Sequence, residues 1–302
     1  MRYFMAFEGV YSIIPTAFTD AGELDPGSQR AVVDLFIAKG ANGLTVLGVT
    51  GEVARLEENE RAAVLGTVVK QANGRVPIIA GTSADGTRTC ISYTRQAKDL
   101  GASAVMVSPP RMPKLNSAAV VNHYKALADA VDLPIIVQDY PPITGFAMEP
   151  ALLARIAREI PSARTIKLED PPTPFKTSRI LEHADGMDLR IFGGLGGVFL
   201  LEELLAGATG AMTGFAFPEM LVRIVSLFRA GDVDGAAGVF YRAVPLMRFE
   251  FQESIGMAIR KEVLRRRGAL SSAATRAPAA GLDATTRAAL DRVMKWVEAE
   301  SA

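Results

Sequence analysis

The chain has 302 residues, and its 33 lysine and arginine residues balance its 33 aspartate and glutamate residues. Without a net charge, no field extends over the whole surface to attract nucleic acid or an anionic membrane, so we expect a small-molecule partner. The length suits one large α/β barrel or two smaller domains, and either would bury a sizeable core.

A single cysteine, Cys90, excludes an intramolecular disulfide and cannot by itself build a thiolate metal site. The N-terminus has no long apolar stretch followed by a small-residue cleavage site, and no later segment reaches the roughly 18 uncharged apolar residues of a membrane span. We therefore expect a soluble, cytoplasmic protein with no membrane partner.

Short β-rich runs alternate with helical patterns along the first 217 residues. The predicted strands are Val10–Ile14, Gly43–Leu47, Val76–Gly81, Ala104–Ser108, Pro134–Asp139, Arg164–Leu168, Leu189–Gly193 and Gly210–Thr213. The predicted helices are Ser28–Lys39, Glu57–Ala72, Thr87–Leu100, Ser117–Ala130, Glu149–Ile160, Pro174–His183 and Gly197–Ala206. Strands separated by crossover helices must lie parallel, so eight such units predict a (β/α)8 TIM barrel.

The remaining sequence, from about Pro218 to Glu300, has a helical pattern interrupted by a flexible-looking stretch rich in Ala and Ser, Ser271–Gly281. We interpret residues 1–217 as the barrel with the active site and residues 218–302 as a C-terminal helical extension of the same domain. The basic run Arg260–Arg267 could be a nucleic-acid patch, but on a helix we expect it to face solvent or another subunit.

Lys167 lies in a run, Ala163–Glu169, that otherwise has the pattern of a buried strand. Burying an unpaired ammonium is so costly that the group normally loses its proton, and a neutral amine can attack a carbonyl to form a Schiff base. The alternative is a strand-end lysine whose amine reaches solvent or pairs with Glu169. Glu169 itself is either a modulator or acid/base partner of Lys167 or an exposed strand-end carboxylate.

In a barrel, the residues that carry out chemistry gather at the C-terminal ends of the strands, and several motifs of this sequence fall there. The second strand leads into Gly48-Val49-Thr50-Gly51-Glu52. The backbone N–H groups of this turn and its Thr50 hydroxyl could hold a carboxylate, although the turn could also be an ordinary loop with Glu52 as a structural acid that satisfies loop N–H groups.

The other strand ends carry a polar turn and two glycine-rich segments. The fifth strand leads into Gln138-Asp139-Tyr140-Pro141, and the seventh and eighth lead into Gly193–Gly197 and Gly214–Phe217. Glycine-rich backbone can approach a ligand closely. The two histidines, His123 and His183, fall on predicted helices away from the barrel mouth, and we find no metal-binding cluster.

These motifs, in this order, resemble those of the dihydrodipicolinate synthase/N-acetylneuraminate lyase superfamily of class I, Schiff-base-forming lyases. The resemblance extends from Gly9 into the helical C-terminal region. It implies a TIM barrel that forms a homo-oligomer, a tetramer or dimer, in which Lys167 makes an imine with pyruvate or another 2-oxo acid. No metal or organic cofactor is then required, because the protonated imine is the electron sink.

The resemblance also implies a set of substrate contacts. Thr50 and its loop would hold the substrate's carboxylate. The expected substrate-binding residues are Gly48, Val49, Thr50, Gly51, Glu169, Gly194 and Phe215.

Four positions depart from the synthases of this superfamily. Gln138 stands at the place of the catalytic strand-5 tyrosine, and Val49 replaces the first threonine of a Thr-Thr pair. Arg111 or Pro110 stands nearest to the place of the tyrosine that completes the proton relay across a subunit contact, and Ile143 replaces the arginine for the second substrate's carboxylate. Because proton transfer depends on the hydroxyl groups missing here, these replacements argue against the activity of a 4-hydroxy-tetrahydrodipicolinate synthase. We keep that activity as an alternative function.

The Gln138-Asp139 pair instead resembles the sugar-acid branch of the superfamily, whose 2-keto-3-deoxy acid dehydratases carry a similar Gln-Asp-x-Pro turn and an eighth strand like Gly207–Gly214. The predicted function is thus a Schiff-base lyase, either an aldolase or a dehydratase, with Lys167, Tyr140 and Gln138 as catalytic residues. Tyr140 shares a strand face with Gln138 if the strand stays regular. It competes with Glu169, and with a water held by Gln138, for the role of proton carrier.

Two further alternatives remain open. We expect four apolar side chains near the mouth: Val49, Ile143, Phe215 and Phe217. They would also suit an aldolase substrate whose aldehyde part is less polar, or even aromatic. A different class of function is an inactive barrel that binds a 2-oxo acid as a sensor or regulator. The retained Lys167 argues against it, because a binding-only site would gain more from a permanently charged arginine.

Overall fold

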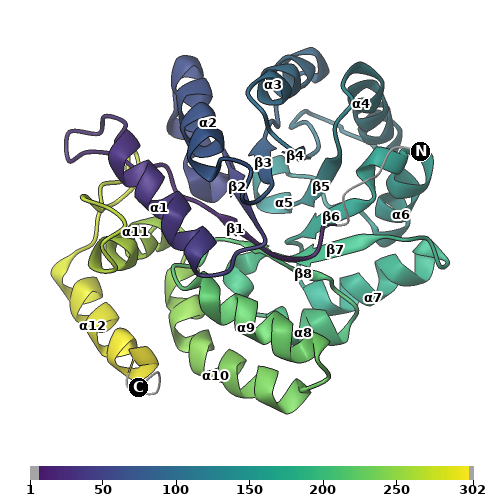
Figure 1. The fold of residues 1–302 in the computed structure, drawn as a ribbon. Coiled ribbons are helices and arrows are strands. Elements are labelled where there is room, and N and C mark those ends of the chain that lie inside the picture. Colours follow the sequence, from purple (N-terminus) through teal and green to yellow (C-terminus); the bar gives the residue numbers. More distant parts are fainter. Residues whose placement is uncertain (1–6, 299–302) are drawn as a thin grey trace.

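Eight parallel strands form a closed barrel in which each strand pairs with the next in sequence and β8 pairs with β1 (Figure 1). This computed structural model describes residues 7–298. The strands are β1 (Gly9–Ile13), β2 (Gly43–Val46), β3 (Ile78–Gly81), β4 (Ala104–Val107), β5 (Ile135–Asp139), β6 (Thr165–Leu168), β7 (Arg190–Gly193) and β8 (Gly210–Thr213). Each lies within two residues of its predicted range, and the predicted TIM barrel is confirmed.

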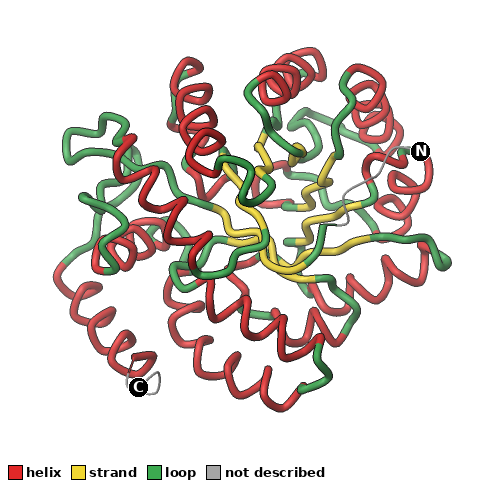
Figure 2. The backbone as a smooth tube through the Cα atoms, viewed as in Figure 1, coloured by secondary structure: helices red, strands yellow, loops and turns green. Residues whose placement is uncertain are grey.

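Helices surround the barrel (Figure 2). They are α1 (Pro26–Ala38), α2 (Glu58–Ala72), α3 (Thr87–Asp99), α4 (Ser117–Ala130), α5 (Pro141–Thr144), α6 (Pro150–Glu159), α7 (Thr173–Ala184), α8 (Leu200–Leu205), α9 (Pro218–Arg229), α10 (Val233–Glu250), α11 (Gly256–Arg266) and α12 (Ala284–Glu298). The predicted boundary at residue 217 falls directly before α9, which packs against β1 and α10. Across residues 7–298, no helix is long and apolar enough to cross a membrane.

Apolar side chains fill the interior of the barrel below its mouth. The interior cluster consists of Phe7, Tyr11, Ile79, Ala104, Met106, Ile136, Phe192 and Met212. Successive side chains on a strand point to opposite faces. Gln138 lies two residues after the inward-pointing Ile136 and therefore also points inward, and Gly214 has the same relation to Met212. A larger apolar core lies between the strands and the surrounding helices. A ligand can therefore reach the barrel axis only from the C-terminal ends of the strands.

The basic run on α11 does not form the exposed face that we predicted. Arg260, Lys261 and Glu262 are 3%, 0% and 2% exposed. Arg260 pairs with Glu250, and Lys261 pairs with Glu52. The prediction was wrong for Arg260 and Lys261 because their partners lie outside the run and cannot be seen in the local pattern, whereas Glu262 pairs with Arg265 and Arg266 of the run itself.

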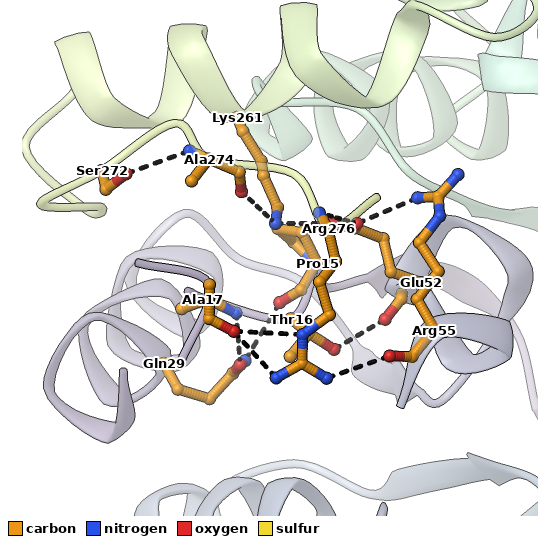
Figure 3. A network of polar contacts seen from close by, with 12 residues as sticks. Pro15, Thr16, Ala17, Gln29, Glu52, Arg55, Lys261, Ser272, Ala274 and Arg276 are labelled. Carbon is orange, nitrogen blue, oxygen red and sulfur yellow. Dashed lines mark hydrogen bonds and ion pairs between the residues drawn. The ribbon is translucent and has the colours of Figure 1, made fainter. Parts of the chain in front are cut away.

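The connection between α11 and α12 (residues 267–283) is hydrogen-bonded to the barrel, unlike the flexible stretch that its composition indicated. The backbone N–H of Arg276 donates to Glu52 Oε2 (3.1 Å), and its guanidinium donates to both carboxylate oxygens of Glu60 (2.5 and 2.6 Å). Lys261 Nζ donates to the carbonyl of Ala274 (2.8 Å). Figure 3 shows Lys261, Ala274 and Arg276 of the C-terminal region close to Glu52 of the loop after β2.

Candidate active site

The lysine predicted as nucleophile lies at the C-terminal end of β6, next to Gln138 of β5 in the register of the two strands. The side chain of Lys167 is 3% exposed, and its Nζ lies 2.9 Å from Glu169 Oε2. The same carboxylate oxygen accepts a hydrogen bond from Gln138 Nε2 (2.7 Å). Lys167 is therefore both buried and paired with Glu169, and Gln138 holds the carboxylate in place.

Gln138 is itself fixed by a residue that sequence analysis did not select. Ser108, which follows the last residue of β4, donates from Oγ to Gln138 Oε1 (2.9 Å). The backbone N–H of Ser108 in turn donates to Ser83 Oγ (2.9 Å). With both ends of its amide engaged and no titratable proton, Gln138 orients Glu169 but cannot relay protons as a phenol would. The sequence did contain an indication of this contact. Ser108 ends the predicted strand next to that of Gln138, so both residues were expected at the same end of the barrel.

Gly194 leaves room for the carboxylate of Glu169. A Cβ atom on Gly194 would lie 2.8 Å from both Cδ and Oε1 of Glu169. Real Cβ contacts are essentially never this short, so any larger residue would displace the carboxylate. Gly194 thus lies against Glu169, and its lack of a side chain helps to define the position of that carboxylate.

A cavity of about 420 Å³ opens at the mouth on the side of Gln138 and Ser108. Its wall includes Gly48, Val49, Ser108, Gln138 and Ile143. Val49 and Ile143 are 41% and 40% exposed, so the cavity has an apolar side as well as the polar side formed by Gln138 and Ser108.

The turn after β2 has an available hydroxyl. Val49–Gly51 forms a single 3-10 turn, closed by a hydrogen bond from Gly51 N–H to Gly48 C=O (2.9 Å). Thr16 Oγ1 donates to the carbonyl of Gly51 (2.6 Å) and ties the turn to the loop after β1. Thr50 Oγ1 is buried, and it has no hydrogen-bond partner within the described part of the chain.

Glu52, directly after this turn, is a structural acid that bridges distant segments. It adopts a left-handed conformation (φ 59°), and its carboxylate contacts Lys261, Arg55 Nη1 (2.9 Å) and the N–H of Arg276. The N–H group that it satisfies therefore belongs to the α11–α12 connection and not to its own loop.

Two predicted residues are placed differently from expectation. Tyr140 lies beyond the end of β5, where it caps the start of α5, and its side chain is half-buried. Burial raises the pKa of its phenol, and so do the charges of Glu169 and Glu253 to a smaller extent. The phenol therefore stays protonated at neutral pH.

Phe215 is wrong as a substrate contact. It is 1% exposed, belongs to the core outside the barrel and packs on Phe217 with ring centroids 6.1 Å apart. Strand alternation turns Gly214 inward and Phe215 outward.

The histidines lie outside this site. His123 is on α4, where Nδ1 is 2.9 Å from Thr87 Oγ1, and burial lowers its pKa. His183 is in the last turn of α7. Within residues 7–298, no group of three or more His, Cys, Asp or Glu side chains is arranged to hold a metal ion.

Buried polar groups also lie on the outer side of β5 to β7. Lys176 Nζ bridges Asp139 Oδ2 (2.6 Å) and Asp170 Oδ2 (2.7 Å). Glu203 accepts a hydrogen bond from Thr173 Oγ1 (2.6 Å), and burial raises the pKa of Glu203 to about 8. These contacts tie α7 to the end of β5 and α8 to the first residue of α7.

Comparison with known proteins gives a consistent picture. A model of the dihydrodipicolinate synthetase family matches residues 6–297. An L-2-keto-3-deoxyarabonate dehydratase of Azospirillum brasilense is 35% identical over 93% of this chain and 92% of its own length. A dihydrodipicolinate synthase from Rhodopseudomonas palustris has a similar structure, with a TM-score of 0.91 and 36% identity over 96% of this chain and 97% of that chain.

A prophage protein of E. coli K12, which belongs to the dihydrodipicolinic acid synthase family and was solved in complex with pyruvate, is also similar. Its TM-score is 0.90, with 26% identity over 97% of this chain and 99% of that chain. The family match covers nearly the whole chain, and the similar solved structures share its fold. Both findings are consistent with the buried lysine at the mouth of the barrel. The chain belongs to the dihydrodipicolinate synthetase family and is a Schiff-base-forming lyase on a (β/α)8 barrel.

Proposed function

We propose that this enzyme dehydrates a 2-keto-3-deoxy sugar acid through an imine on Lys167, with Glu169 as the acid/base. One observation carries the proposal: a single carboxylate oxygen of Glu169 contacts both Lys167 Nζ and Gln138 Nε2. This arrangement puts a carboxylate that can act as acid and base beside the nucleophile. The carboxylate would take over the proton transfer for which the synthases of the family use a tyrosine on strand 5. The dehydratase name of the Azospirillum brasilense relative supports this branch.

The reaction begins with the amine of Lys167. Transfer of its proton to Glu169, across 2.9 Å, frees the nitrogen lone pair to attack C2 of the 2-oxo acid. Glu169 returns this proton to the hydroxyl of the adduct, which leaves as water and gives a protonated imine. The positive charge of the imine stabilises a carbanion at C3. Thr50 and the turn of residues 48–51 hold the substrate's carboxylate during these steps.

Elimination then uses Glu169 twice. Its carboxylate removes a proton from C3, and the electron pair forms the enamine. The carboxylic acid returns that proton to the hydroxyl on C4, which leaves as water while the C3–C4 double bond forms. The alternating acid and base roles need one carboxyl group close to both atoms, as general acid–base catalysis requires.

Gln138 disfavours the alternative function of 4-hydroxy-tetrahydrodipicolinate synthase. Its amide accepts from Ser108 and donates to Glu169, so it has no proton to relay. Ile143, in place of an arginine, offers no charge to a second substrate's carboxylate.

An aldolase remains the second candidate. Val49 and Ile143 give the cavity an apolar side, which suits a less polar aldehyde half. Cleavage of the C3–C4 bond would release that aldehyde and leave the same enamine on Lys167. The two candidates therefore share the imine and differ in the bond broken at C4.

Borohydride reduction in the presence of pyruvate tests the shared step. We expect a stable adduct on Lys167 by intact mass and peptide mapping, and none in Lys167→Ala. A 2-keto-3-deoxy pentonate or hexonate should then lose water without releasing pyruvate. Release of an aldehyde and pyruvate would support the aldolase, and condensation of pyruvate with aspartate semialdehyde would support the synthase. An absent adduct with pyruvate and longer 2-oxo acids would favour the inactive binding barrel.

We also propose that the enzyme is a cytoplasmic homo-oligomer, a tetramer or dimer, with no nucleic-acid partner. Large exposed side chains on three different helices support an oligomer: Phe175, Tyr241 and Trp296 are 60%, 62% and 75% exposed. Light scattering after size-exclusion chromatography should give two or four times 32.2 kDa. A single-chain mass at working concentration would contradict this.

A further inference from the structure

A buried arginine from the C-terminal region adjoins the turn assigned to the substrate's carboxylate. Arg260, on α11, is 3% exposed, and its Nε donates to Glu250 Oε2 (3.1 Å). Its Nη1 is buried and has no hydrogen-bond partner among residues 7–298, and the same is true of Thr50 Oγ1. Unpartnered buried donors are rare in native structures and call for an explanation.

Gly214 brings these two groups together. A Cβ atom on Gly214 would lie 2.7 Å from Arg260 Cζ and 3.3 Å from Thr50 Oγ1, and it would overlap Nη1. Gly214 faces the barrel axis, because it follows the inward Met212 by two residues. The guanidinium therefore occupies the place of an inward side chain at the end of β8, next to the Thr50 hydroxyl.

The charge of Arg260 is incompletely compensated. Glu250 is its only ion-pair partner within the described chain, and Glu250 also accepts from the N–H of Ala216 (3.1 Å). Burial raises the pKa of Glu250 to about 7, although Arg260 acts against this rise. Arg260 therefore shares its ion-pair partner with a backbone N–H, and Nη1 of its guanidinium remains unpaired beside Thr50.

We propose that Arg260 is a positioning residue for the substrate's carboxylate. Its spare N–H and the Thr50 hydroxyl, neither of which has a partner among the described residues, lie together beside Gly214, and the charge of Arg260 favours an anion at that turn. This inference rests on the proposed function, since it assumes a 2-oxo acid bound with its carboxylate at Thr50. It adds a fixed cation to a subsite that otherwise consists of neutral groups.

A comparison of charged and neutral ligands tests this role. Borohydride trapping is measured over a range of pyruvate concentrations and, in parallel, of pyruvamide, which has the same ketone but no charge. In Arg260→Met, the half-saturating pyruvate concentration should rise at least about tenfold, as the loss of a charged hydrogen bond implies. The value for pyruvamide should stay nearly unchanged. A merely structural role would change both ligands in parallel, and that result would overturn the proposal.

Two further variants complete the test. Arg260→Lys keeps a buried cation beside Glu250 but loses the fork of the guanidinium, so it should show a smaller rise that is again selective for pyruvate. This variant decides the question if Arg260→Met does not fold, as judged by circular dichroism and thermal melting. Arg265→Met, on the exposed side of the same helix, should leave both ligands unaffected. Failure of the native chain to trap pyruvate would refute the proposed function, whereas trapping without selectivity in the Arg260 variants refutes only this inference.

Discussion

Lys261 of α11 and Glu52 of the loop after β2 form an ion pair in which both side chains are almost completely buried, at 0% and 1% exposure. Burial lowers the pKa of Lys261, and the charge of Glu52 acts against that change. The Lys261 Nζ also lies 4.4 Å from the centre of the Phe18 ring. Through this pair the C-terminal region directly contacts the residue that follows the proposed carboxylate turn.

Removing one partner of this pair should strongly destabilise the protein. In Lys261→Met, Glu52 would keep only the partly exposed Arg55 as an ion-pair partner (28% exposed), so we expect a loss of about 3 kcal/mol in the free energy of unfolding, the low end for a broken buried pair. Urea denaturation followed by circular dichroism measures it. Arg179→Met, in the exposed pair Arg179–Glu182, is the matched control and should leave the midpoint nearly unchanged. A loss for Lys261→Met no larger than the control's would contradict the structural role of the pair.

Replacing Glu169 by glutamine should separate the two halves of the reaction. Removing a general acid/base typically lowers kcat by about 10²–10⁴-fold, so dehydration by Glu169→Gln should fall by this amount. Borohydride should still trap pyruvate on Lys167, but more slowly than in the native chain, because the amine remains while its proton acceptor is lost. Glu253→Gln, a nearby exposed carboxylate, is the control. Normal dehydration by Glu169→Gln in a steady-state assay would assign proton transfer to another group.

Gly194→Ala should impair catalysis without unfolding the protein. The added methyl group would push Glu169 away from Lys167, and a displacement of about 1 Å commonly costs about a hundredfold in rate. Gly66→Ala is the control, since no heavy atom lies within 4 Å of its Cβ position on α2. Steady-state kinetics together with melting curves distinguish the two effects. Full activity of a folded Gly194→Ala enzyme would argue against a fixed position for Glu169.

The pH dependence of stability should contain a contribution from Glu203. Its pKa is raised from 4.5 to about 8, so the folded protein keeps a proton that the unfolded chain loses. The free energy of unfolding should therefore fall as the pH rises from about 4.5 to about 8, and then level off. Glu203→Gln should remove this slope and be more stable than the native chain at pH 9, but not at pH 4. Urea unfolding at several pH values checks this, and parallel curves for the two proteins would contradict it.

The strands were predictable because each is a short apolar run followed by a distinctive turn. The proximity of Lys167 and Glu169 followed from strand alternation within β6. The bond from Gln138 to Glu169 could not be foreseen, because it depends on the register of β5 against β6, and the role of Ser108 depends on β4 in the same way.

The errors came from groups whose partners are distant in sequence or whose strand face was misassigned. Three consecutive charged residues, Arg260 to Glu262, look exposed in any local pattern, yet two of their partners are Glu250 and Glu52. Phe215 looked like a mouth residue from its position after β8, but its parity along the strand places it in the outer core.

The contacts of Glu52 also set an order of events during synthesis. The turn of residues 48–51 leaves the ribosome early, whereas Lys261 and Arg276, which hold the adjoining Glu52, are made in the last fifth of the chain. Until they emerge, Glu52 has no buried cation to enclose it, and the mouth cannot take its final form. A nascent barrel would thus gain its ability to bind a 2-oxo acid only when translation is nearly finished.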